Sequence, residues 1–201
     1  MSLFPELDAP AAPGPLVGFY RRQAEAVLCE QHYTHSVPSG KSRYYYYAGA
    51  IIVYSIPANP YLGRFLLGRP ATVWELTRLW APDGHEKNLL TQAISASVGW
   101  FHQEEPTVEA LVSYADPNVG HLGGIYRAAS WLYTGQSEES RYYRGPEKEV
   151  VARRKFHSGS RFFTKSEIEA AGYVEEARPG KHRFARGLDR FARRDLERRW
   201  S

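Results

Sequence analysis

The stretch VEALVSYADPNVGHLGGIYRAASWLYTG (residues 108–135) decides the fold, because it joins a strand to a glycine-rich turn and a helical segment. Its first part, VEALVSYA, is a nearly continuous apolar run, which is typical of a strand covered on both faces. This run delivers a serine and a tyrosine to its end and is followed by Asp116. Ligands of open α/β sheets bind beyond the carboxyl ends of the strands, so we expect a functional site here.

Outward from this stretch, hydrophobic spacing and turn residues predict the other elements. Helices are expected over residues 16–32, 89–102, 165–172 and 188–200, and one begins near residues 120–124. A hairpin or strand pair split by Ala48–Gly49 is expected over residues 44–56, and strands over 72–81, 149–156 and 182–187. Residues 36–42 and 82–88 are expected to be a loop and a turn, and residues 58–70 an irregular connection.

The strand over residues 72–81 alternates Val73, Glu75, Thr77 and Leu79 against Trp74, Leu76, Arg78 and Trp80, which predicts two different faces. Residues 1–15 hold four prolines and are expected to form a disordered or loosely packed arm. Residues 16–201 are then predicted to be one α/β domain with a mixed sheet, ending in a basic helix over 188–200.

The bulk composition is that of an ordinary globular protein, with 43% hydrophobic and 24% charged residues in 201. No apolar run approaches 18 residues and the N-terminus lacks a signal-peptide pattern, so we expect no membrane span. Cys29 is the single cysteine, which excludes an intrachain disulfide and favours a reducing, cytoplasmic location.

The net charge of +4 conceals a basic C-terminus. Residues 178–201 hold nine Lys/Arg and three Asp/Glu, a balance of +6, which leaves 17 basic and 19 acidic residues, or −2, for the rest. One interpretation is that this basic segment contacts a polyanion such as DNA. The other is that it is the solvated end of a helix. The candidate contacts to DNA are Ser39, Lys41, Arg43, Lys181, Arg183, Arg190, Arg194 and Arg198.

The order helix, hairpin, strand, helix, strand, helix, strand resembles the GNAT acyltransferase superfamily. This resemblance implies a mostly antiparallel sheet whose two central parallel strands splay apart, flanked by helices. It also implies a tyrosine at the place of Tyr126. The usual acyl-CoA loop, Q/R-x-x-G-x-G/A, is absent, since RLWAPDGHEKNLL (residues 78–90) contains only Gly84. An acyl-CoA-type donor and another activated glycine or acyl donor therefore both stay open.

Four blocks in order resemble the Mom family of phage DNA-modification proteins, from about Glu30 to Arg199: HYTHSVPSGKS, WELTRLWAPDGHEKN, the opening stretch, and KHRF with its basic tail. The resemblance implies transfer of a small group of glycinamide (carbamoylmethyl) type to the N6 amine of adenine, which protects phage DNA from host restriction. It places functional roles on His32, Tyr33, Arg78, Asp116 and Tyr126. A homodimer is a further possibility.

Each of these residues also has a structural interpretation. Asp116 could orient the amine or accept its proton, or could cap the next helix. Tyr126 could protonate a leaving group or belong to an aromatic core. His32 closes the first predicted helix, where a cation is favoured by the macrodipole, and Arg78 could clamp an anion or pair with Glu75.

Two further questions concern metal and substrate. His32, His35 and Asp116 are weak candidates for an iron site of two histidines and a carboxylate, and iron is linked to the resembled family. An adenine in a duplex must be flipped out to be modified, and Tyr44–Tyr47, Trp74 and Trp80 could line its pocket or form core. The competing functions are a GNAT N-acetyltransferase acting on a small-molecule or protein amine, and a DNA-binding protein without catalytic activity.

Overall fold

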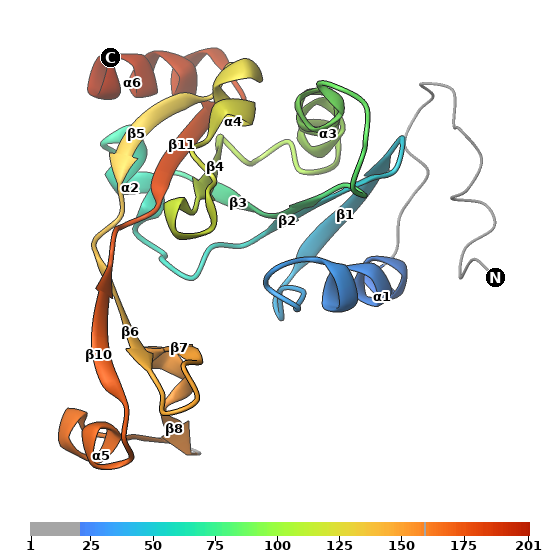
Figure 1. Cartoon of the computed structure of the whole chain (residues 1–201). Coiled ribbons are helices and arrows are strands. Elements are labelled where there is room, and N and C mark those ends of the chain that lie inside the picture. Colours follow the sequence, from blue (N-terminus) through green and yellow to red (C-terminus); the bar gives the residue numbers. More distant parts are fainter. Residues whose placement is uncertain (1–20, 159) are drawn as a thin grey trace. The chain divides into compact units, whose positions relative to one another are not determined.

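The computed structural model describes residues 21–158 and 160–201 (Figure 1). They form two compact units. Unit 1 comprises residues up to Tyr114 together with Gly123–Thr134 and Arg183–Ser201, and unit 2 comprises Ala115–Leu122 and Gly135–His182. The expectation that residues 16–201 form one domain stays a prediction. The predicted arm over residues 1–15, and residues 16–20 of the first predicted helix, lie outside the described residues.

Unit 1 is built on a six-stranded sheet with the order β1-β2-β3-β4-β11-β5. The strands are β1 (Ser42–Tyr47), β2 (Ala50–Ser55), β3 (Val73–Trp80), β4 (Ala110–Ala115), β5 (Leu132–Gln136) and β11 (His182–Gly187). β2 is antiparallel to both β1 and β3, whereas β3 and β4 are parallel. The predicted mixed α/β architecture with a mostly antiparallel sheet is confirmed.

Local chemistry explains the β1–β2 hairpin. Ala48 and Gly49 both have positive φ angles, 45° and 94°. Positive φ at both central residues defines the tight turn whose twist matches that of two antiparallel strands. Tyr47 and Ala50 pair directly across this turn, as the Ala-Gly break in the sequence predicted.

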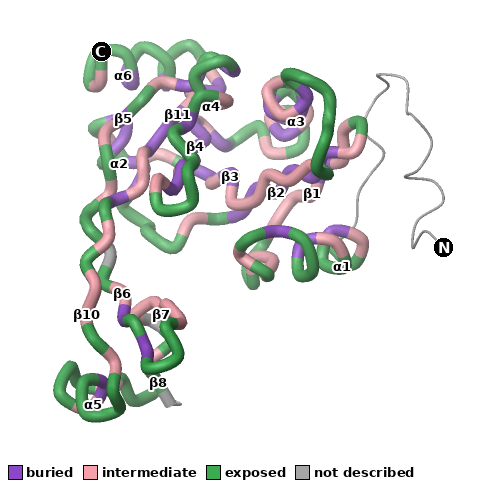
Figure 2. Tube along the Cα trace, viewed as in Figure 1, coloured by how far each residue is buried: buried purple, intermediate pink, exposed green. Residues whose placement is uncertain are grey.

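Two helices cover opposite faces of the sheet next to this hairpin (Figure 1). From α1 (Arg21–Gln31), Ala24 and Leu28 pack on Ile51 and Val53. From α3 (Leu89–Glu104), Phe101 contacts the rings of Tyr54 and Trp74, at centroid distances of 4.8 and 5.2 Å. β2 and β4 are buried along most of their length (Figure 2), as expected for strands covered on both sides.

A β-bulge on β3 changes the predicted alternation of its side chains. Val53 pairs with Arg78 and the next residue, Tyr54, pairs with Leu76, so Thr77 is the extra residue. A bulge shifts the following side chains to the other face of a strand. Trp80 accordingly packs with the α1 cluster, whereas Trp74 contacts α3. The predicted grouping of Arg78 and Trp80 with Trp74 and Leu76 was therefore wrong.

The segment predicted as an irregular connection contains a helix, α2 (Leu62–Leu67). Leu62, Leu66 and Leu67 join a core cluster with Ala192 and Leu196 of α6 (Arg190–Trp200). Gly68 ends α2 in the left-handed conformation at φ 74°. A glycine stop followed closely by Pro70 is a helix-end signal that the sequence contained.

The helix expected after β4 is shorter than its aromatic spacing indicated. A 3₁₀ turn, η1 (Pro117–Val119), precedes α4 (Gly124–Ala128), and Trp131 already leads into β5. The predicted start near residues 120–124 is confirmed. At the C-terminus, α6 buries Ala192 and Leu196, which confirms the apolar side of the predicted basic helix.

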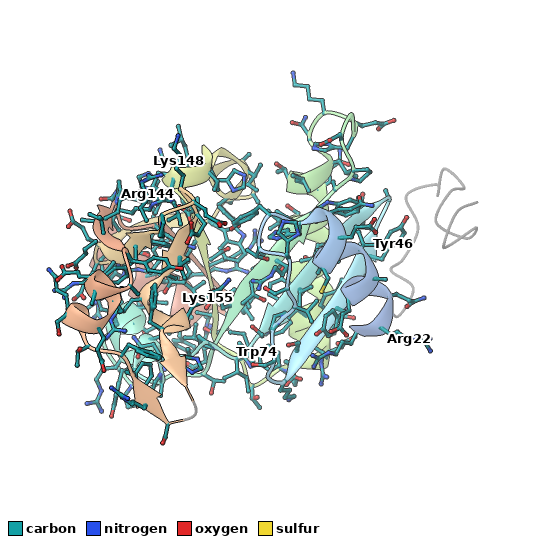
Figure 3. All side chains as sticks on the ribbon, turned by 60° about the horizontal axis from the view of Figure 1, so that its bottom comes forward. Arg22, Tyr46, Trp74, Arg144, Lys148 and Lys155 are labelled. Atoms are coloured by element: carbon teal, nitrogen blue, oxygen red, sulfur yellow. The ribbon has the colours of Figure 1, made fainter. Side chains whose placement is uncertain are left out.

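Unit 2 contains a three-stranded sheet with the order β10-β6-β7. Its elements are β6 (Ser140–Arg144), β7 (Val150–Ala152), the 3₁₀ turn η2 (Arg153–Lys155), β8 (His157–Ser158), β9 (Arg161–Phe162), α5 (Lys165–Ala170) and β10 (Val174–Arg178). Tyr143 contacts Phe156, which contacts Tyr173 in turn. Arg144 and Lys148 lie close together at the β6–β7 connection (Figure 3). The predicted helix over 165–172 is α5, and Gly172 follows it at φ 84°.

Among the helices of the described residues, none combines the length and apolarity needed to cross a membrane.

Candidate functional site in unit 1

His32 lies just beyond the end of α1 and is buried, with 5% of its surface exposed. Its Nδ1 accepts a hydrogen bond from the main-chain N–H of Thr34 at 3.1 Å and lies 2.8 Å from the Thr34 hydroxyl. Accepting that N–H requires an unprotonated Nδ1, which favours the tautomer with its proton on Nε2. Tyr33 is 47% exposed, and its ring lies against the imidazole with 4.5 Å between the ring centroids and 32° between the ring planes.

Arg78 fixes the loop that carries this pair. Its Nε donates to the Ser36 carbonyl at 2.8 Å and its Nη2 to the Ser36 hydroxyl at 3.0 Å, while Nη1 donates to the Thr77 carbonyl at 2.7 Å. The bulge at Thr77 brings the guanidinium to the α1 side of the sheet. Arg78 thus positions the loop after α1 through the carbonyl and the hydroxyl of Ser36.

Tyr126 lies where the parallel pairing of β3 and β4 ends. The last paired residues are Leu76 and Ser113, although β3 continues to Trp80. Ser113 Oγ lies 2.9 Å from the Leu76 carbonyl oxygen and 2.8 Å from the Tyr126 hydroxyl. One buried serine thus connects the phenol of α4 to the main chain of β3.

Burial raises the pKa of Tyr126 to about 12, against the opposite effect of its hydrogen bond to Ser113. The charge of Glu75 raises the pKa further, as does Tyr33. Tyr126 is therefore a neutral phenol at physiological pH, suited to donating a proton or hydrogen bond and unsuited to acting as an anion.

Ser113 and Glu75 are functional candidates that the sequence reasoning missed. Ser113 was noted only as the end of a strand, and Glu75 only as a partner for Arg78. Glu75 influences two phenols, since it also raises the pKa of Tyr114, behind the larger effect of burial. Polar residues on an otherwise apolar strand were the available signal.

Asp116 belongs to unit 2, where it caps η1. Its Oδ1 accepts from the Asn118 main-chain N–H at 3.0 Å and from the Asn118 side chain at 2.8 Å, and Lys181 Nζ lies 3.0 Å from Oδ2. Burial by itself would raise the pKa of the Asp116 carboxyl, but these donors outweigh it and lower the pKa. A carboxylate held in this way is a weak proton acceptor. Lys181, predicted as a DNA contact, is its ion-pair partner.

His32 and His35 lie in unit 1 and Asp116 in unit 2, so the iron site expected from these three residues stays a prediction. No group of three His, Cys, Asp or Glu side chains within residues 21–158 and 160–201 has the arrangement needed to hold a metal ion. His32 Nδ1 is occupied by Thr34, and His35 Nδ1 lies 3.1 Å from the Cys29 carbonyl.

The predicted DNA contacts differ in their availability. Lys41 and Arg43 form ion pairs with Glu104 and Glu105 at the end of α3, and Ser39 is exposed beside them. Arg183 is buried: its Nη2 donates to the Thr134 carbonyl, and its guanidinium lies 4.2 Å from the Phe65 ring. Arg183 was predicted to contact DNA, but its guanidinium is not available to a phosphate.

The predicted arginine edge of α6 is exposed. Arg190, Arg194 and Arg198 all face solvent. Arg190 lies 4.6 Å and Arg194 6.0 Å from the centre of the Phe191 ring, which is itself 50% exposed. Arg198 is 75% exposed although it pairs with Asp195. Of the candidate aromatic walls, Tyr45 and Trp74 are buried core residues.

The chain was compared with known proteins. A family model described as the Mom protein family matches residues 18–200. Methylcarbamoylase mom of Escherichia phage Mu is 35% identical over 69 residues, which are 34% of this chain and 28% of the phage protein. The curated relative is thus matched over less than a third of its own length, while the family match covers nearly the whole described chain.

Proposed function

Because the chain belongs to the Mom protein family, we propose that it is an enzyme that modifies DNA. The reaction would place a carbamoylmethyl-type group on the N6 amine of adenine, in phage DNA that is thereby protected from restriction. The observation that carries this proposal is the family match over residues 18–200. The name methylcarbamoylase of the phage Mu relative supports the type of group transferred.

The reaction requires that the N6 amine be held in position and that its proton be removed. The N6 lone pair is delocalised into the purine ring, so N6 is a poor nucleophile. A carbamoylmethyl product requires that a bond form between N6 and the methylene carbon of the donor, while the bond from that methylene carbon to its leaving group breaks. N6 loses one proton to a base or to water, and the leaving group takes up one proton. Positioning can supply roughly 7–11 kcal/mol, and acid–base help about 10²–10⁴-fold.

We assign the proton donor to Tyr126. Its hydroxyl is neutral at physiological pH and is connected through Ser113 to the end of the β3–β4 pairing. Arg78 is a positioning residue, because its guanidinium holds the loop that carries His32 and Tyr33. The exposed ring of Tyr33, which lies against His32, is a surface on which a flipped base can rest.

The topology supports a GNAT-type fold as part of this proposal. The parallel strands β3 and β4 pair over only four residues each. β3 then continues to Trp80 paired with β2, beyond its last pair with β4, and this is where such a fold would admit its donor. The connection from β3 to α3 contains Gly84 as its single glycine, which favours a donor other than ordinary acyl-CoA.

The test is mass spectrometry of nucleosides from plasmid DNA that is co-expressed with the soluble protein and any required partner. A modified deoxyadenosine, with the mass of a carbamoylmethyl substituent, is expected. Arg78→Lys keeps the charge but cannot contact Ser36 in the same forked way, so it should reduce the modification about tenfold or more. Unmodified deoxyadenosine from folded wild-type protein would refute the proposal. Acetyl-CoA binding without DNA affinity would favour acetyl transfer.

A further inference from the structure

A pocket of about 190 Å³ lies in unit 1, between α6, β11, β5 and the residues that follow α4. Its polar lining comes from Ser130, Arg186, Arg193 and Glu197, and Leu132 and Leu196 contribute apolar surface. None of these residues has a role in the proposed transfer. Small-molecule sites commonly measure roughly 300–1,000 Å³, so this pocket suits one chemical group better than an entire cofactor.

Two guanidinium groups in this pocket are anchored by neutral acceptors. Arg186 Nη1 donates to the Ala129 carbonyl at 2.6 Å, and Arg193 Nε donates to the Gly187 carbonyl at 3.1 Å. Neither arginine has a carboxylate within ion-pair distance in the part of the chain that the structure describes. Burial lowers the pKa of Arg186, and the charge of Arg193 lowers it further, so the two cations repel each other. An anion between them would relieve this repulsion.

Ser130 adds a second, independent feature. It follows the end of α4 with φ 61°, a left-handed conformation at a position where helices commonly have glycine. Glycine would adopt this backbone without strain, whereas serine adds a hydroxyl that can donate a hydrogen bond. Strained backbone conformations in non-glycine residues cluster at ligand sites. A hydroxyl donor therefore lines the same pocket as the two guanidinium groups.

We propose that this pocket binds a phosphate-type oxyanion, with Arg186 and Arg193 as charged donors and Ser130 as a neutral donor. Guanidinium groups match phosphate oxygens through paired N–H donors. The phosphate belongs either to a small phosphorylated ligand or to the DNA backbone. The carboxylate of Glu197 lines the same pocket and repels an anion there. Removing this carboxylate therefore tests whether the ligand is negatively charged.

The experiment is titration calorimetry of the full chain with inorganic phosphate at constant ionic strength. Removing one charged donor from an oxyanion commonly costs tenfold or more in affinity. Arg193→Gln should therefore weaken phosphate binding about tenfold or more. Arg199→Gln is the matched control, because Arg199 is exposed on the same helix and does not line the pocket, and it should leave the affinity within about twofold. Glu197→Gln should tighten binding.

Equal losses in Arg193→Gln and Arg199→Gln would overturn the proposal, because they would indicate general charge attraction. Absence of phosphate binding in the wild type would overturn it too. Competition with a short DNA duplex identifies the source: phosphate that displaces DNA indicates a backbone contact, and phosphate that binds beside DNA indicates a small ligand. Phosphate binding is measured without adenine modification. A negative result would therefore refute the phosphate site and leave the proposed function untouched.

Discussion

At the scale of single residues, hydrogen bonding and burial set the protonation of Tyr126 and Asp116. Burial dominates for Tyr126 and keeps the phenol neutral. For Asp116 the hydrogen bonds from Lys181 and Asn118 outweigh burial and keep the carboxyl ionised. Near neutral pH, Tyr126 is therefore protonated and Asp116 is ionised, as the free side chains would be.

Tyr126→Phe tests the proton donor. General acid catalysis contributes about 10²–10⁴-fold, so the yield of modified deoxyadenosine should fall at least tenfold. Stability should fall by only about 0.5–1.5 kcal/mol, because one hydrogen bond is lost and Ser113 can still donate to the Leu76 carbonyl. Nucleoside mass spectrometry and urea unfolding measure the two effects. Full modification by the variant would reduce Tyr126 to a core residue.

Asp116→Asn tests the ion pair with Lys181. A carboxyl whose pKa is lower in the folded state stabilises the fold above its unfolded pKa, near 3.9, and loses this contribution as the pH falls through the folded pKa. We therefore expect wild-type stability to decline more steeply than that of the variant below about pH 4. At pH 7 the variant should be less stable by about 1–3 kcal/mol. Parallel unfolding curves at pH 7 and pH 3 would contradict the assignment.

At the scale of elements, close approaches of the backbone decide where α4 begins. Gly123 has φ 80°, and a Cβ there would lie 2.1 Å from the Phe184 ring, whereas a Cβ on Gly124 would meet nothing within 4 Å. The two adjacent glycines therefore differ in how well they tolerate an added side chain. The sequence identified the glycine pair as a helix start but could not rank the two, because Phe184 is distant in the chain.

Gly123→Ala should destabilise the protein by roughly 2 kcal/mol or more, since backbone strain and overpacking each cost about 1–3 kcal/mol. Gly124→Ala is the matched control and should change the free energy of unfolding by less than about 1 kcal/mol. Urea denaturation of both variants measures the difference. Equal unfolding midpoints would show that the Phe184 contact does not constrain this turn.

At the scale of the whole molecule, some basic residues are neutralised by ion pairs with carboxylates, and others are available to bind DNA. Lys41 and Arg43 are paired with Glu104 and Glu105, whereas Arg190 and Arg194 are exposed on α6. Deleting residues 188–201 would also remove the core residues Ala192 and Leu196. Charge removal on α6 is therefore a cleaner test of DNA binding than truncation.

Arg190→Gln combined with Arg194→Gln should weaken DNA binding and reduce the slope of log K against log salt by about 2, since each phosphate contact contributes about 0.9. Lys41→Gln combined with Arg43→Gln removes the same charge and should change the slope by less. Fluorescence anisotropy with a DNA duplex across a salt series measures both. The reverse ranking would move the DNA surface from α6 to the β1 edge.

The sequence alone determined the order of most elements, the β1–β2 hairpin, the buried strand β4 and the amphipathic α6, because periodicity and turn residues are local properties. The functional roles expected for Tyr126 and Arg78 came from the family resemblance and stay predictions. Only the tertiary structure decided the bulge at Thr77, the link from Ser113 to Tyr126, the burial of Arg183 and the pairing of Lys181 with Asp116. Each of these depends on residues far apart in the chain, whose contacts no local pattern encodes.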